Sequence, residues 1–122
     1  MIAYTIEGAS ALIDEHPYAN VACLGLAFKP NVTDLRESPA VEVTKGLGER
    51  YGLRIKVVEP YLDSLPDEIT ATDAEFRRPW ECFANCEVAI VLVDHDEFRN
   101  VPLGERRHLS VLDTRGIWGD LD

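Results

Sequence analysis

The apolar residues of this chain fall into short runs of strand length. Val21–Leu26 and Val88–Val93 are almost entirely apolar, and Arg54–Val58 and Ser110–Asp113 repeat the pattern with a few polar residues. Apolar runs of this length are typical of parallel strands that helices cover on both faces. The pattern therefore predicts four strands in a buried, mainly parallel sheet.

Segments with helical spacing alternate with these runs. Met1–Glu15 carries apolar residues on one helical face, which predicts an amphipathic helix. Ser38 followed by a proline is a helix start signal, so a second helix is expected over Pro39–Arg50, with Gly52 at its exit. Strands that alternate with helices predict an α/β fold: a three-layer, Rossmann-like domain with a mainly parallel sheet flanked by helices.

Three other segments give weaker signals. Tyr61–Thr72 is polar and predicts a loop with at most one helical turn. Asp73–Cys86 predicts a helix in two pieces, and Asp94 predicts the cap of a short helix after the third strand. The side chains expected to face inward from the two-piece helix are those of Trp80, Phe83 and Ala84.

Composition narrows the classes of function. The chain has 122 residues, of which 46% are hydrophobic, and this suits one compact domain. Lys and Arg total 12 against 22 acidic residues, a formal net charge of −10. Nucleic acids and anionic membranes need a basic protein surface, so neither is expected as a partner. No stretch reaches the apolar length of a membrane span.

Three cysteines bear on compartment and metal binding. Cys23, Cys82 and Cys86 cannot all pair within one chain, and no secretory signal precedes them, so a reducing cytoplasm is expected. Cys82 and Cys86 could in principle hold a metal, but no further ligands stand at zinc spacing. Buried core thiols are the interpretation we favour, and no metal site is predicted.

Four candidate site residues follow the predicted strands. Lys29 and Arg36 come after the first strand, His95 after the third and Arg115 after the fourth. Loops after parallel strands emerge at one edge of the sheet, so all four residues are expected there. Together with the start of the Pro39–Arg50 helix, the three cations would form a site for a phosphate anion.

Surface ion pairing is the alternative explanation for two of these cations. Arg36 could pair with Asp34 or Glu37, and Arg115 with Asp113, in exposed pairs that contribute little to stability. Both interpretations stay open at this point.

Two further residues also allow two interpretations each. Phe28 could pack on a ring of a ligand or lie in the core. His95, between two aspartates, could act as an acid or base, but a solvated histidine in a capping loop is the interpretation we favour. Gly25 is not followed by a glycine-rich dinucleotide fingerprint, so a complete cofactor site is not expected in this chain.

Several motifs resemble one known family. The stretch GLAFKPNVTDLRESPAVEV, Gly25–Val43, is similar to the signature of the C-terminal domain of the UDP-glucose/GDP-mannose dehydrogenase family. VEP at Val58–Pro60, LVDHDEF at Leu92–Phe98 and LDTRGIW at Leu112–Trp118 resemble that domain in the branch that oxidises UDP-N-acetylmannosamine to its uronic acid. The resemblance covers nearly the whole chain.

The resemblance implies a domain organisation and an activity. Residues 20–122 would be the C-terminal UDP-sugar-binding domain of an NAD-dependent nucleotide-sugar 6-dehydrogenase, and residues 1–19 the end of its central connecting helix. Such an enzyme is expected to be a cytoplasmic homodimer of polysaccharide biosynthesis, with NAD bound mainly by an N-terminal domain. The family's nucleophilic cysteine lies outside the matched part, so this chain alone is expected to be inactive and to hold no catalytic residue.

The resemblance also implies roles for individual residues. Phe28 and Lys29 would contact the UDP-sugar, Arg36 would reach NAD, and Arg115 would contact the substrate diphosphate or the cofactor. Thr33 departs from the acidic residue that is common at its position in the motif. The alternative hypotheses are a stand-alone nucleotide-binding or regulatory module without catalytic activity, and an interaction domain that binds no nucleotide.

Overall fold

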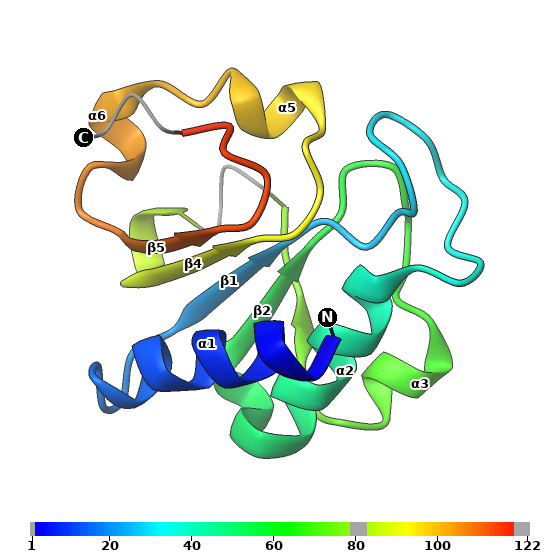
Figure 1. Cartoon of the computed structure of the whole chain (residues 1–122), viewed down its shortest axis with the longest axis horizontal. Coiled ribbons are helices and arrows are strands. Elements are labelled where there is room, and N and C mark those ends of the chain that lie inside the picture. The colour runs from blue at the N-terminus through cyan, green and yellow to red at the C-terminus, as the bar shows by residue number, and fades with distance from the viewer. Residues whose placement is uncertain (1, 79–82, 119–122) are drawn as a thin grey trace.

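A parallel sheet forms the centre of the molecule (Figure 1). The computed structural model of the chain describes residues 2–78 and 83–118. Within these residues the strands lie in the order β3-β2-β1-β4-β5, and every neighbouring pair is parallel. The strands are β1 (Val21–Leu24), β2 (Ile55–Val58), β3 (Glu75–Phe76), β4 (Val88–Val91) and β5 (Ser110–Asp113).

The position of β1 at the centre of the sheet explains why apolar and polar residues do not alternate in the run Val21–Leu26. All four of its residues are fully buried, with Val21 and Cys23 in the core on one face of the sheet and Ala22 and Leu24 in the core on the other. Successive side chains of a strand point to opposite faces, so a strand between two covered faces needs apolar residues at every position.

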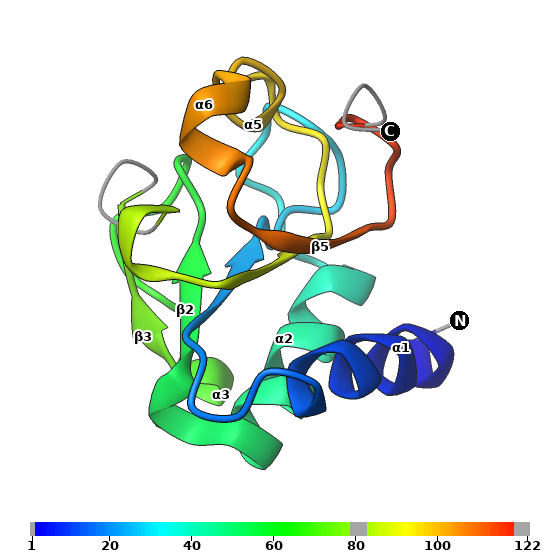
Figure 2. The same ribbon diagram turned by 90° about the vertical axis from the view of Figure 1, so that its left-hand side faces the viewer.

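Helices cover one face of the sheet, as Figures 1 and 2 show. Helix α1 buries Ala9 and Ile13, which lie four residues apart on one helical face, and α2 buries Val43 and Leu47 at the same spacing. The two helices pack against each other as well as against the sheet. These elements are α1 (Ile2–Asp14), α2 (Pro39–Tyr51) and the single turn α3 (Asp67–Thr70); a 3-10 turn, η1 (Gly52–Arg54), leads from α2 to β2.

Short turns cover the opposite face, above the sheet in Figure 2. Large side chains fill the space beneath these turns, including Phe83, Phe98 and Trp118. The Trp118 indole N–H donates to the Phe98 carbonyl at 2.9 Å, and the Arg106 guanidinium lies 5.1 Å from the centre of the Trp118 ring. The elements here are η2 (Phe83–Asn85), α5 (Asp96–Arg99) and α6 (Leu103–Arg106).

The predicted fold class is confirmed. All four predicted strands are present, although the runs Val21–Leu26 and Val88–Val93 each end two residues earlier as strands. Both long helices form, and α3 is the single turn expected within Tyr61–Thr72. The sheet has helices or turns on both faces, which gives the three layers that the pattern predicted.

The first piece of the helix predicted over Asp73–Cys86 is wrong, whereas the described part of the second piece contains the 3-10 turn η2. Glu75–Phe76 forms the edge strand β3, which pairs with β2. The Lys56 ammonium of β2 lies 3.0 Å from the Glu75 carboxylate on the adjacent strand, so this pair supports the strand pairing.

The inward-facing residues of that segment were only partly predicted. Phe83 is buried as expected, whereas Ala84 is exposed and the prediction for it is wrong. Trp80 and Cys82 lie outside the described residues.

Two predicted helix caps differ from the structure. Ser38 does precede α2, but its hydroxyl donates to the Leu26 carbonyl at 2.6 Å and caps no helical N–H. This bond ties the start of α2 to the segment that leaves β1. Asp94 is not the cap of α5, because His95 holds that position and Asp94 instead pairs with Arg99 at 3.1 Å.

The described cysteines are buried thiols. Cys23 and Cys86 are both buried in the core as thiols, as predicted. Burial, and then the nearby Cys86, raise the pKa of the Cys23 thiol to about 12, so this thiol is not a nucleophile near neutral pH. Among the described residues no group of three or more His, Cys, Asp or Glu side chains could hold a metal ion. No helix in the described ranges is long and apolar enough to span a bilayer.

Substitution of Gly25 tests the close approach of the chain at the end of β1. Gly25 has a φ of +100°, and a Cβ atom there would lie 2.5 Å from the Cβ of Val93. We expect Gly25→Ala to lower the free energy of unfolding by at least about 2 kcal/mol. Alanine would be strained at this positive φ, and its Cβ would overlap the buried side chain of Val93. Urea denaturation followed by circular dichroism measures the effect.

Gly104→Ala is the matched control for this variant. A Cβ atom on Gly104, in α6, would meet nothing within 4 Å. We expect it to change the free energy of unfolding by less than about 0.5 kcal/mol. Equal stability of the two variants would contradict the tight packing of Gly25 on Val93.

Candidate functional site

The loops that follow β1, β2, β4 and β5 gather at one edge of the sheet (Figure 1). All strands are parallel, so their carboxyl ends meet at this edge, which is where ligands bind in α/β proteins. The longest of these loops, residues 25–38, joins β1 to α2 and projects beyond the end of the sheet. We call it the β1–α2 loop.

The β1–α2 loop is fastened at its base and at its tip. At the base, the Phe28 N–H donates to the Asp34 carbonyl at 2.8 Å. At the tip, Asn31 adopts a left-handed conformation with φ of +63°, and its N–H donates to Nδ1 of His95 at 2.7 Å. Lys29 lies between these two points, so a hydrogen-bonded frame holds the segment that carries it.

Glu59, the first residue after β2, is the anchor of this edge. Its side chain is fully buried, and one oxygen, Oε1, accepts the N–H groups of Leu26 at 2.8 Å and Ala27 at 3.1 Å. The other, Oε2, accepts the Tyr61 N–H at 3.1 Å and lies 2.9 Å from Nε2 of His95. A buried carboxylate is tolerated where hydrogen-bond donors surround it, and here four donors do so.

The hydrogen bonds of His95 determine its tautomer. The Asn31 N–H is a donor, so Nδ1 of His95 must be the acceptor. The imidazole proton therefore lies on Nε2, which donates to the Glu59 carboxylate. The ring is fully buried, 4.7 Å from the ring of Tyr61 and 5.4 Å from the ring of Phe98, measured between centres. A neutral imidazole thus satisfies both of its neighbours.

The side chain of Asn31 adds a second connection between the same loops. Its Oδ1 accepts the N–H of Asp96, at the start of α5, at 3.0 Å. The Tyr61 hydroxyl lies 3.2 Å from this oxygen and 3.0 Å from the carboxylate of Glu97. The loops that follow β1, β2 and β4 are therefore joined by side chains that are far apart in the sequence.

The hydrogen bonds around Glu59 favour its ionised form. Burial would raise the pKa of the carboxyl group, but the hydrogen bond from His95 and the N–H groups of Leu26 and Tyr61 outweigh it, and the pKa is lowered below its usual value. Glu59 is therefore a carboxylate at neutral pH.

Arg36 is in the exposed ion pair that was the alternative to an anion site. Its guanidinium donates to both carboxylate oxygens of Asp34, at 3.1 and 3.0 Å, and is 88% exposed. The hydrogen bonds from Arg36 lower the pKa of Asp34 to about 2. Such an exposed pair contributes little to stability, so the guanidinium can exchange Asp34 for another anion at small cost.

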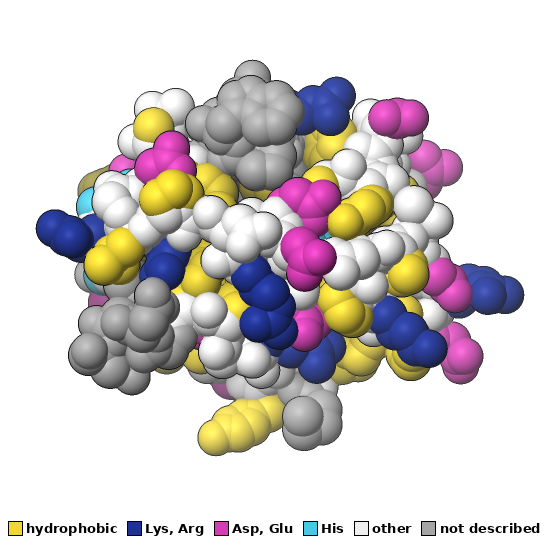
Figure 3. All heavy atoms as spheres, turned by 90° about the horizontal axis from the view of Figure 1, so that it is seen from above, with side chains coloured by type: hydrophobic (Ala, Val, Ile, Leu, Met, Phe, Trp, Pro, Cys, Tyr) yellow, Lys and Arg dark blue, Asp and Glu magenta, His cyan; other side chains and the backbone are white. Residues whose placement is uncertain are grey.

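Phe28 and Lys29 are both exposed on the β1–α2 loop. Phe28 is 46% exposed, so the interpretation as a core residue is wrong. The Lys29 ammonium forms no hydrogen bond or ion pair with another residue of the described ranges. On the face seen in Figure 3, Lys and Arg side chains stand beside Asp and Glu side chains and form no continuous basic patch.

Arg115 is held at the end of the sheet by bonds that differ from the expected ion pair. Its Nε donates to the Leu92 carbonyl at 3.1 Å. The Asp113 carboxylate accepts three backbone N–H groups, from Arg115 at 3.1 Å, Gly116 at 2.7 Å and Trp118 at 2.8 Å. Asp113 therefore shapes the turn that carries Arg115, and the guanidinium is placed beside the exit of β4.

The structure corrects the prediction for His95 and adds a residue that the sequence analysis missed. All four predicted residues follow strands at the carboxyl edge, as expected. His95 is not solvated, because the Glu59 carboxylate and the Asn31 N–H bind both of its ring nitrogens inside the protein. Glu59 was not among the predicted site residues. An acidic residue directly after a buried strand was the available signal.

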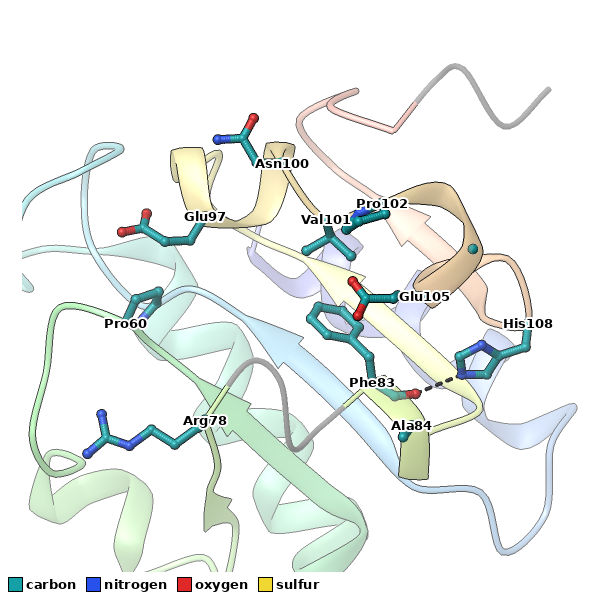
Figure 4. A pocket seen from close by; sticks show the side chains of 11 residues that line it. Pro60, Arg78, Phe83, Ala84, Glu97, Asn100, Val101, Pro102, Glu105 and His108 are labelled. Carbon is teal, nitrogen blue, oxygen red and sulfur yellow. Dashed lines mark hydrogen bonds between the residues drawn. The ribbon is translucent and has the colours of Figure 1, made fainter.

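A cavity of about 820 Å³ lies beside this network, between the end of β2 and the helical turns α5 and α6 (Figure 4). Pro60, Phe83 and Val101 give it apolar walls. Glu97, whose carboxylate is bonded by the Tyr61 hydroxyl, lies at one side of it. None of the predicted residues Phe28, Lys29, Arg36 and Arg115 is among the described residues that line it.

Comparison with known proteins identifies similar chains. The family model described as "UDP-glucose/GDP-mannose dehydrogenase family, UDP binding domain" matches residues 22–120. A UDP-N-acetyl-D-mannosamine dehydrogenase of Salmonella typhi is 38% identical over 98 residues, and an NDP-N-acetyl-D-galactosaminuronic acid dehydrogenase of Ralstonia solanacearum is 35% identical over 98 residues. Each match covers 80% of this chain and 23% of the relative, so the chain spans about a quarter of the relatives' length.

Solved structures share the fold. The UDP-N-acetyl-mannosamine dehydrogenase of Staphylococcus aureus superimposes with a TM-score of 0.72 at 21% identity, covering 95% of this chain and 27% of that one. A GDP-mannose dehydrogenase of Pseudomonas aeruginosa gives a TM-score of 0.67 at 23% identity, covering 92% of this chain and 28% of that one.

Glu59→Gln tests the buried carboxylate. The amide would place a donor against the donors that surround Glu59, so we expect the free energy of unfolding at pH 7 to fall by about 2–4 kcal/mol. The pKa of Glu59 is lower in the folded protein, so its carboxylate stabilises the fold fully above the unfolded value of about 4.3, and this stabilisation is lost as pH falls further. Urea denaturation from pH 8 to pH 3 should show a constant difference that narrows below about pH 4.

Glu68→Gln removes an exposed carboxylate at the start of α3 and serves as the control. We expect it to change the free energy of unfolding by less than about 0.5 kcal/mol. A wild-type advantage over Glu59→Gln that stays constant down to pH 3 would show that Glu59 does not act as a carboxylate.

Proposed function

The chain belongs to the UDP-glucose/GDP-mannose dehydrogenase family, and we propose that it holds the UDP part of the substrate of an NAD-dependent nucleotide-sugar 6-dehydrogenase. The match of residues 22–120 to the family's UDP binding domain carries this proposal. The matched part includes the whole β1–α2 loop, the anchor Glu59 and the turn of Arg115.

For the complete enzyme we propose UDP-N-acetylmannosamine as substrate and its uronic acid as product. Relatives named UDP-N-acetyl-D-mannosamine dehydrogenase, from Salmonella typhi and Escherichia coli, are 38% and 37% identical to the chain. The motifs after β2, β4 and β5 support the same branch. NAD is the proposed oxidant, and it receives the electrons of the sugar alcohol.

Lys29 and Phe28 are the proposed substrate contacts on the β1–α2 loop. The Lys29 ammonium is exposed and forms no hydrogen bond or salt bridge in the described ranges, although its charge helps to lower the pKa of Asp34, so it is available to a phosphate oxygen. The half-exposed ring of Phe28, the preceding residue, offers an apolar surface on the same loop. A cation next to an aromatic ring suits a ligand that joins a diphosphate to rings.

Arg115 and Arg36 are the proposed contacts at the border of the site. Arg115 stands on a turn fixed by Asp113, with its Nε bonded to the end of β4, so its remaining N–H groups can reach a diphosphate or the cofactor. Arg36 would leave its exposed pair with Asp34 to meet NAD. NAD itself would be bound mainly by another part of the enzyme.

We place binding in this chain and oxidation elsewhere in the enzyme. The chain spans 23% of the relative from Salmonella typhi, and we assign the nucleophile, most of the NAD site and the dimer contacts to the remainder of such an enzyme. Residues 1–19 would be the end of the connecting helix, and residues 20–122 the UDP-sugar-binding domain. The enzyme would work in the cytoplasm as a homodimer.

Calorimetric titration of the chain with UDP tests the proposal. We expect weak binding, because one domain supplies only part of the cleft. Lys29→Ala and Arg115→Ala should each weaken it by about tenfold, the effect of losing one charged hydrogen bond to phosphate.

Arg50→Ala is the control for the loss of a positive charge. Arg50 is in the last turn of α2, at the opposite end of that helix from the β1–α2 loop, and pairs with Glu7. We expect unchanged UDP affinity for this variant. Absence of UDP binding by the wild-type chain, or equal affinity of all four proteins, would contradict the proposed site.

A further inference from the structure

We propose that Glu59 and His95 are positioning residues that hold Lys29 in the orientation needed to bind a nucleoside diphosphate. The inference rests on the proposed function, because it names the groups that order the site assigned to UDP. Neither side chain reaches the surface, so neither can touch the ligand. Their effect on binding must pass through the β1–α2 loop.

The two residues bracket Lys29 on both sides. Glu59 accepts the N–H of Ala27, two residues before Lys29, at 3.1 Å. His95 accepts the N–H of Asn31, two residues after Lys29, at 2.7 Å. Glu59 and His95 are bonded to each other at 2.9 Å, so one buried pair fixes the backbone on either side of the lysine.

The buried pair of Glu59 and His95 has few alternative arrangements. The Glu59 carboxylate is fully buried, and if it lost a donor it would stay charged away from water. The His95 ring is fully buried against Tyr61 and Phe98, and turning it over would put a carbon in the place of Nδ1 and leave the Asn31 N–H without its acceptor. The chain at Ala27 and Asn31 is therefore fixed by groups that cannot turn away without losing a bond.

A fixed backbone on either side of Lys29 matters for ligand binding because Lys29 is exposed on a loop. Lys29 extends into solvent on a loop, and ordering a flexible loop at the moment of binding reduces affinity. A loop that is already ordered avoids this loss. The structure thus separates the group that would contact phosphate, Lys29, from the buried groups that hold its backbone.

Two substitutions of His95 divide its two hydrogen bonds. In His95→Asn, the amide oxygen can take the place of Nδ1 and accept the Asn31 N–H, while the bond to Glu59 is lost. In His95→Gln, the amide N–H can take the place of Nε2–H and donate to Glu59, while the bond to Asn31 is lost. Each variant removes one of the two bonds and part of the same buried ring.

The experiment makes two measurements on the wild-type chain and on both variants. Calorimetry gives the affinity for UDP, and NMR gives the rate at which the Asn31 amide proton exchanges with solvent. We expect His95→Gln to bind UDP about tenfold more weakly, the equivalent of one hydrogen bond, and to lose exchange protection at Asn31. His95→Asn should keep that protection and bind UDP within about threefold of wild type. Urea denaturation confirms that both variants are folded.

The outcomes separate this inference from the proposed function. If the wild-type chain binds UDP and His95→Gln binds it equally well, the positioning role is overturned and the proposed function stands. If the wild-type chain does not bind UDP, the proposed function and the positioning role for UDP both fail. Equal loss of affinity in the two variants would also overturn the inference, because a general loss of packing would then explain it.

Discussion

The buried carboxylate of Glu59 constrains the whole carboxyl edge of the sheet. Removing a carboxylate from water costs several kcal/mol unless donors replace the water. The donors here are the N–H groups of Leu26, Ala27 and Tyr61 and the imidazole of His95, so they come from the loops after β1, β2 and β4. The charge is satisfied only when these three loops have one arrangement. A single buried carboxylate thus fixes the backbone of three loops that have no regular secondary structure of their own.

The parallel sheet makes this arrangement possible. In β1, Leu24 is paired with Val58 of β2 and Val91 of β4, so the three strands end at the same level. Gly25 then lets the chain pass close to Val93, where any side chain would collide. The residues that follow each strand consequently leave the sheet side by side. The network at the edge depends on strand register, and the register depends on the fully buried residues of β1.

Local patterns predicted the elements but not the contacts between them. Period and length predicted β1, α2 and β4, and parallel topology predicted that Lys29 and Arg115 lie at one edge. The pairing of Glu59 with His95 joins residues 36 positions apart, and no local pattern encodes such a bond. The edge strand β3 was missed for the same reason, because its two residues are strand only through pairing with β2.

The acidity of the chain makes the orientation of Lys29 more important than its charge alone. With a formal net charge of −10, the protein as a whole repels a diphosphate. Several described cations at the surface are also paired with acidic residues, as in Arg36–Asp34, Arg50–Glu7, Lys56–Glu75 and Arg99–Asp94. The net charge of the chain therefore does not attract a diphosphate to the proposed site. The proposed site would therefore depend on short-range bonds from Lys29, which forms no salt bridge among the described residues and stands on a loop that the buried Glu59–His95 pair already holds in place.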